Sequence, residues 1–133
     1  MIRAAVETAD GVFDLDLELE DVIAFEAGAA LPPAAEPDVP LPGVLAVAGT
    51  GSTLVAVLDR RPPLVVSYDA GATWTEAGGG LPRGRAVAVA ETNPDVVLYG
   101  ARNRLYLSTD GGRFWRALAF EVPEIVRLAV TEA

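Results

Sequence analysis

The side chains best suited to chemistry stand in two copies of one short pattern. The first copy runs from residue 67 to 74 and the second from 108 to 115, so the copies are 41 residues apart. The repeated positions are Ser67, Asp69, Gly71, Thr73 and Trp74, then Ser108, Asp110, Gly112, Phe114 and Trp115. An aspartate beside a hydroxyl group is able to act as an acid or as a metal ligand.

A structural role in a tight turn also explains the residues of this pattern, without any catalytic or metal-binding function. A serine hydroxyl and an aspartate carboxylate two residues apart accept hydrogen bonds from N–H groups that a tight turn leaves unpaired. Gly71 and Gly112 suit the positive φ of such a turn. Trp74 and Trp115 then begin the next strand with a large apolar side chain that packs between sheets. We therefore expect a turn motif, and we assign no catalytic residue and no metal ligand.

Both copies read S-x-D-x-G-x-(T/F)-W, and this pattern resembles the Asp-box, or BNR repeat. That repeat occurs in β-propellers of the sialidase, sortilin-type receptor and photosystem II assembly-factor families. The resemblance implies four-stranded blades with the repeat turns at one end of the ring. It implies a fold more firmly than an activity.

Strand patterns along the chain agree with this fold class. Alternating or continuous Val, Ala and Leu runs predict four short strands in each repeat of about 40 residues. We predict an all-β chain of four-stranded antiparallel blades, about three per chain, in a single domain over residues 1–133. A degenerate acidic blade covers 1–30, a Pro-rich connection 31–42, and the two repeat blades 43–80 and 81–121. Strands are expected at 12–20 and 96–101, with a turn at 93–95.

The number of strands raises the question of how the blades close. The segment 124–131 predicts one strand without companions, and the front of the chain predicts three, so together they complete one blade and remove a free edge. Three blades are too few for a ring of the resembled family. We predict a homodimer that builds a six-bladed ring, in which this strand passes between chains; an open or partial module is the alternative.

Charge is concentrated in the first 40 residues. They hold ten of the 19 acidic residues and a single arginine, so the whole net charge of −9 belongs to them. Such a chain is unsuited to nucleic acid, and the charge favours solubility or a basic partner. No apolar run reaches the length of a membrane helix, and the first residues lack the apolar stretch of a signal peptide. We expect a cytoplasmic protein with no membrane partner.

The segment 13–20 alternates apolar and acidic residues throughout. A continuous strand would place Phe13, Leu15, Leu17 and Leu19 on one face, and Asp14, Asp16, Glu18 and Glu20 on the other. The carboxylates then form either a ladder that binds Ca²⁺ or a basic protein, or a solvated strand face.

Arginines gather in the loops expected at the end opposite the repeat turns. They are the candidate anion-binding or partner-binding residues Arg60, Arg61, Arg83, Arg85, Arg102 and Arg104. Guanidinium groups suit carboxylate or phosphate, and the resemblance to sialidases implies an arginine cluster for a substrate carboxylate on this end. The alternative is that these arginines are solvated or paired with acidic residues.

Most enzyme classes lack their residues here. The chain has no cysteine and no histidine, it has no lysine for a phosphate-binding loop at 49–53, and it has no nucleophile elbow. A sialidase would also need a tyrosine paired with a glutamate, and neither Tyr99 nor Tyr106 has a partner evident in the sequence. We predict a non-catalytic interaction or assembly scaffold without a cofactor. The alternative is a glycosidase-like or glycan-binding half-propeller.

Overall fold

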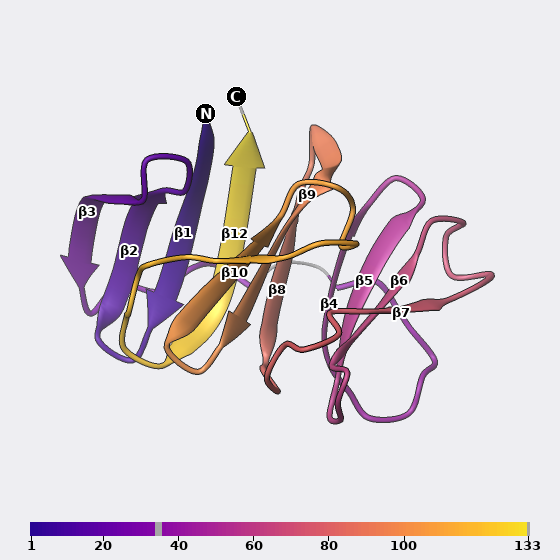
Figure 1. Cartoon of the computed structure of the whole chain (residues 1–133). Helices are drawn as coiled ribbons and strands as arrows, with labels where there is room; N and C mark the ends of the chain where they lie inside the picture. Colours follow the sequence, from indigo (N-terminus) through magenta and orange to yellow (C-terminus); the bar gives the residue numbers. More distant parts are fainter. Residues whose placement is uncertain (34–35, 133) are drawn as a thin grey trace.

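The computed structural model describes residues 1–33 and 36–132, and within them the chain is all-β, with no helix (Figure 1). Accordingly, the described residues contain no helix able to cross a membrane. The strands are β1 (Ile2–Thr8), β2 (Gly11–Asp16), β3 (Asp21–Ala27), β4 (Val44–Thr50), β5 (Thr53–Leu58), β6 (Leu64–Ser67), β7 (Thr75–Ala77), β8 (Ala86–Ala90), β9 (Asn93–Ala101), β10 (Arg104–Ser108), β11 (Arg116–Ala117) and β12 (Ile125–Glu132).

In the described part of the chain these strands form three four-stranded antiparallel sheets. The terminal sheet has the order β12-β1-β2-β3, the first repeat sheet β4-β5-β6-β7, and the second repeat sheet β8-β9-β10-β11. The predicted fold class is therefore confirmed. Each repeat sheet is a meander because tight turns join consecutive strands.

The C-terminal strand completes the N-terminal sheet, as the strand count predicted. β12 pairs with β1 from Ile2 opposite Glu132 to Thr8 opposite Ile125. The pairing lies within one chain, which corrects the expectation that this strand passes to a second chain. Because β1 and β12 of the same chain pair with each other, the sheet is complete without a strand from a second chain.

The second repeat sheet lies between the other two. β8 contacts β12 on one side and β4 on the other. Each of these three strands stands at the inner end of the strand order of its sheet, opposite the outermost strands β3, β7 and β11. Figure 1 shows the same order, with the terminal sheet at the left and the first repeat sheet at the right. The three sheets thus pack face to face around these inner strands, which is the arrangement of propeller blades.

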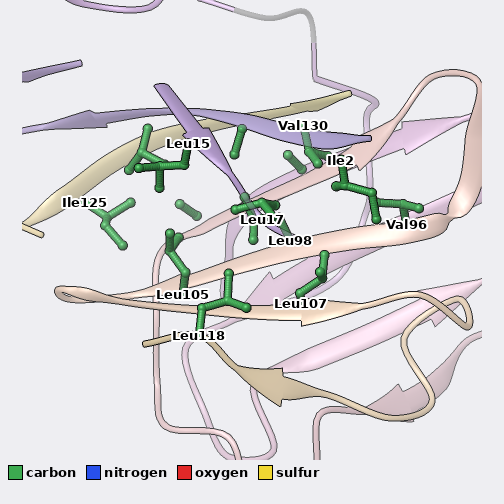
Figure 2. Close-up of a cluster of buried hydrophobic side chains, with 14 of the residues drawn as sticks. Ile2, Leu15, Leu17, Val96, Leu98, Leu105, Leu107, Leu118, Ile125 and Val130 are labelled. Atoms are coloured by element: carbon green, nitrogen blue, oxygen red, sulfur yellow. The ribbon is translucent and has the colours of Figure 1, made fainter. Parts of the chain in front are cut away.

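Two apolar layers hold the sheets together. One lies between the terminal and second repeat sheets and includes Leu15, Leu17, Leu98, Leu105 and Ile125 (Figure 2). The other lies between the two repeat sheets and includes Val55, Val57, Leu64, Val66 and Tyr99. Most of these side chains are fully buried, and each such burial stabilises the fold by about 1.5–3 kcal/mol.

Two predicted boundaries are wrong. β2 ends at Asp16 rather than residue 20, because Asp16 Oδ1 accepts hydrogen bonds from the N–H groups of Glu18 and Leu19, both at 3.0 Å, and turns the chain. Leu19 is consequently 72% exposed instead of packed. The turn expected at 93–95 lies at Glu91 and Thr92, and β9 already begins at Asn93.

The Pro-rich connection covers the outer face of the first repeat sheet. Val39 and Leu41 pack against Val47, Leu58 and Val65, which form a separate apolar cluster on that face. The outer face of the terminal sheet is polar instead, with Arg3 paired to Asp14 and Arg127 paired to Glu7. Leu31 N donates to Glu7 Oε1 at 2.9 Å, so the connection contacts both outer faces.

Candidate functional site

The first repeat turn is closed by its serine and aspartate. Ser67 Oγ accepts from Gly71 N at 2.8 Å and donates to Asp69 Oδ1 at 2.7 Å. Asp69 Oδ1 also accepts from Thr73 N at 2.9 Å, and the Thr73 hydroxyl donates to Asp69 Oδ2. Both carboxylate oxygens are therefore used within the turn.

The second turn repeats this geometry. Ser108 Oγ accepts from Gly112 N at 2.9 Å and donates to Asp110 Oδ1 at 2.8 Å, while Asp110 Oδ1 accepts from Phe114 N at 3.0 Å. Phe114 has no hydroxyl to take the role of Thr73, and its ring is 79% exposed. Gly71 and Gly112 have φ of +94° and +95°. Glycine adopts such positive φ values without strain, which confirms the conformation predicted for both residues.

The two tryptophans pack on different layers. Trp115 joins the layer between the repeat sheets, where its ring lies edge-on to Tyr99 at 6.3 Å, and its Nε1 donates to Gly112 O at 2.9 Å. Trp74 packs on the outer face of the first repeat sheet, beside the Pro-rich connection. The expectation that the tryptophans wedge between sheets thus describes Trp115 and not Trp74.

Hydrogen bonding stabilises the ionised form of both aspartates. Bonds from the Thr73 hydroxyl and N–H, followed by the Ser67 hydroxyl, lower the pKa of Asp69 to about 2. The Phe114 N–H, followed by the Ser108 hydroxyl, lowers the pKa of Asp110. A carboxylate held in its ionised form is a poor general acid. The hydrogen bonds of both aspartates instead close their turns.

These shifts predict a loss of stability in acid. In the unfolded chain Asp69 protonates near 3.8, whereas in the folded chain it stays ionised to lower pH. Its contribution is therefore complete above about pH 5 and declines as the pH falls from about 4 towards 2. Urea unfolding between pH 6 and 2 measures this, and Asp69→Asn should give a flatter acid profile than the wild type. Equal slopes for the two proteins would contradict the assignment.

The terminal sheet has a related turn that the sequence pattern did not reveal. Asp16 lies at the end of the third strand of its sheet, where Ser67 and Ser108 lie in theirs. Its Oδ1 caps two backbone N–H groups, as the serine oxygens do. The blade is degenerate in sequence because one carboxylate performs the capping that a serine and an aspartate share in the repeats.

The predicted arginines divide into two groups. Three pair with carboxylates: Arg60 with Glu76 at 2.8 Å, Arg83 with Asp59 at 3.9 Å, and Arg104 with Glu121 at 3.6 Å. Arg61, Arg85 and Arg102 are exposed and form no ion pair with any described residue. Three of the six guanidinium groups are thus available for an external anion.

A hollow of about 980 Å³ lies among the inner strands of the three sheets. β4, β8 and β12 line it together with Leu31, Pro32, Pro33 and Glu36 from the connection. Arg85 is the one predicted arginine in this lining, which also includes the exposed apolar residues Leu45 and Val126. The hollow therefore presents one unpaired guanidinium group near apolar side chains.

The hydroxyl of Tyr99 is used in a contact within the fold. The Tyr99 hydroxyl donates to Pro82 O at 2.7 Å, and burial, with the nearby Tyr106, raises the pKa of Tyr99. The rings of the two tyrosines lie 6.1 Å apart. Tyr99 consequently holds the loop before β8 in place through its hydrogen bond to Pro82.

The acidic residues of 13–20 do not form a ladder. Asp14 pairs with Arg3, Glu18 Oε1 accepts from Ile2 N at 2.8 Å, and Glu20 pairs with Arg116 at 3.5 Å. Among the described residues no three acidic side chains come together as a metal site. Each carboxylate instead has its own partner, because β2 ends before the alternation does.

One feature of the surface is not predicted by the sequence pattern. Leu19, Val22, Ile23 and Phe25 are 46–72% exposed on the turn after β2 and on β3. The alternation of 13–20 placed Leu19 on the face expected to pack. β3 is the outermost strand of its sheet, a position that no local sequence pattern encodes. These side chains are therefore left in solvent.

Comparisons with known proteins find structural similarity but no match in sequence. No family model matches the chain, and no curated protein matches it in sequence. A crystal structure of the GH74 enzyme of Niastella koreensis is similar, with 21% identity and a TM-score of 0.49 over 91% of this chain and 18% of that one. A structure of YCF48 bound to D1 peptide is similar at 16% identity and a TM-score of 0.49, over 86% of this chain and 38% of that one.

The chain therefore spans well under half of either protein. The all-β fold of propeller-type blades is established by the sheets themselves. Membership of the Asp-box repeat class stays a prediction.

Proposed function

We propose that this chain is a non-catalytic scaffold whose sheets present a binding surface to another protein. The observation that carries the proposal is the group of exposed apolar side chains at Leu19, Val22, Ile23 and Phe25. Several large exposed apolar side chains within one short segment are a mark of interaction sites. The turn geometry supports the non-catalytic part, since Asp69 and Asp110 are committed to backbone N–H groups.

A site-specific crosslinking experiment tests the scaffold. A benzophenone side chain is placed at Ile23 and, as a control, at Thr109, which is exposed on the second repeat turn. Illumination in extracts of the source cells should give one discrete crosslinked protein from position 23 and none from 109. The supporting result requires that this protein, once identified and purified, binds the purified chain. Absence of a crosslink at both positions, or equal products from both, would refute the proposal.

Anion or glycan binding at the arginine loops is a second candidate. Arg61, Arg85 and Arg102 favour it because they are exposed and unpaired among the described residues. Titration with N-acetylneuraminate and with inorganic phosphate, together with a fluorogenic sialoside assay, tests it. Heat that disappears in Arg85→Ala would support the candidate, and no heat with either ligand would remove it.

The two-chain ring also stays a prediction. A second copy could pack on the outer face of the first repeat sheet only after Val39 and Leu41 leave it. Light scattering on a size-exclusion column distinguishes the states, because the ring requires twice the chain mass of 13.9 kDa. A single-chain mass at micromolar concentration would contradict the ring.

A further inference from the structure

The outermost strand of the terminal sheet is unlike its counterparts in the other two sheets. β3 has seven residues, all exposed, and among the described strands it pairs only with β2. The outermost strands β7 and β11 have three and two residues. Proteins usually shorten or block such edges, because unpaired N–H and C=O groups invite another strand.

The register identifies which backbone groups of β3 face outward. Gly28 N donates to Asp10 O at 2.9 Å, so the N–H group of Gly28 points towards β2. Antiparallel pairs alternate, and Phe25 opposite Phe13 and Ala27 opposite Gly11 fall on the non-bonded positions. The N–H and C=O groups of Phe25 and Ala27 therefore point away from β2, towards solvent.

Apolar side chains lie along the same edge. Val22, Ile23 and Phe25 are 54%, 47% and 46% exposed. The Phe25 ring lies 4.5 Å from the ring of Phe13, which packs on the core between the sheets. An incoming strand would thus meet an aromatic side chain that is already held in place.

Unpaired negative charge accompanies this edge. Asp21 and Glu26 on β3 are exposed and form no ion pair with a described residue. The neighbouring carboxylates of Asp14 and Glu20 have arginine partners. A second copy of the chain would bring the same negative charges to the contact, so the charge favours a basic occupant.

We propose that β3 binds an extended segment of a partner protein in which apolar and basic residues alternate. This inference rests on the proposed scaffold function and specifies its partner. The segment adds a fifth strand to the terminal sheet and bonds to the outward groups of Phe25 and Ala27. Its apolar side chains lie beside Val22 and Phe25, and its basic side chains lie on the other face, near Asp21 and Glu26.

Calorimetric titration with a synthetic eight-residue peptide of alternating valine and arginine tests the mode of binding. Ala27→Pro removes one outward N–H and blocks the edge with the proline ring, while the inward bonds of β3 remain. We expect this variant to keep its thermal midpoint and to bind at least about tenfold more weakly. Unchanged affinity in a folded Ala27→Pro protein would overturn strand addition.

A charge exchange tests the identity of the partner. Asp21→Lys with Glu26→Lys should weaken the valine–arginine peptide about tenfold and create binding of a valine–glutamate peptide. The matched control, Glu91→Lys with Glu124→Lys, makes the same change in net charge at two exposed residues in connections outside β3. Equal weakening by the control pair would show that the peptide senses only the overall charge, and would overturn the proposal.

Two further results separate this inference from the scaffold function. Self-association of the wild type that Ala27→Pro abolishes would make a second copy the occupant and refute a basic segment. A purified partner that crosslinks at Ile23 and binds Ala27→Pro as tightly as wild type would leave the scaffold function intact and refute strand addition. If no partner crosslinks at all, the scaffold function itself fails.

Discussion

Replacing Ile125 with alanine is expected to lower the free energy of unfolding by about 2–5 kcal/mol. Ile125 is 5% exposed and belongs to the core between the terminal and second repeat sheets. Its Cγ2 lies 3.1 Å from the position that a Cβ on Gly100 would take, so the side chain fills the space against that backbone. Its N–H also donates to Arg102 O at 2.7 Å, and that bond survives the substitution. The loss is therefore one of packing, and urea unfolding measures it.

The neighbouring residue provides the control. Val126 lies on the same strand but is 47% exposed, so Val126→Ala should change stability by less than about 0.5 kcal/mol. Similar losses in the two variants would contradict the burial of Ile125.

The same experiment tests how β12 is supplied. Association of two chains, with or without strand exchange, makes the unfolding midpoint rise with protein concentration, whereas a chain that stays single and supplies its own strand gives a constant midpoint. At concentrations where light scattering gives the single-chain mass, we expect a constant midpoint, because β12 pairs with β1 of its own chain.

The features that the sequence predicted well are local. The spacing of Ser67, Asp69 and Gly71 specifies a turn because each of its hydrogen bonds spans four residues or fewer. The strand predicted at 124–131 agrees with β12 (Ile125–Glu132) to within one residue at each end. The completion of the terminal sheet was also predictable, because three strands at the front leave a place for a fourth.

The features that the sequence did not predict depend on contacts between distant segments. The carboxylate of Asp16 ends β2 inside an unbroken alternation, because capping two N–H groups outweighs continued pairing. Nothing in the sequence of residues 36–42 indicates that Val39 and Leu41 cover apolar side chains of β4, β5 and β6. The pairing of Arg60, Arg83 and Arg104 with carboxylates depends on which loops meet at one end of the sheets.

The two outer faces suggest how three sheets persist without a complete ring. A repeat stack needs terminal faces that tolerate water. Here the Pro-rich connection covers the apolar face of the first repeat sheet, and ion pairs occupy the face of the terminal sheet. Among the outermost strands of the three described sheets, β3 is the longest and the only one that is exposed along seven residues, so its edge is the best placed to bind another strand.

The repeat motif itself gives the second large effect, because Ser108→Ala should cost about 1–3 kcal/mol of unfolding free energy. Ser108 is 1% exposed, and its Oγ accepts from the buried N–H of Gly112 at 2.9 Å. Without the hydroxyl that N–H has no partner, and Asp110 loses the donor at 2.8 Å that helps hold its carboxylate.

Thr109→Ala is the matched control, since Thr109 is exposed in the same turn and its side chain forms none of the turn's hydrogen bonds. Chemical denaturation of Ser108→Ala, Thr109→Ala and wild type compares the costs, and peptide titration at the β3 edge follows binding in the same proteins. A structural motif predicts that Ser108→Ala loses stability and that the folded protein binds as the wild type does, because the second repeat turn and β3 belong to different sheets. A Ser108→Ala protein of unchanged stability that had lost a function would instead make this serine part of a working site, and would overturn the assignment of both turns as structural.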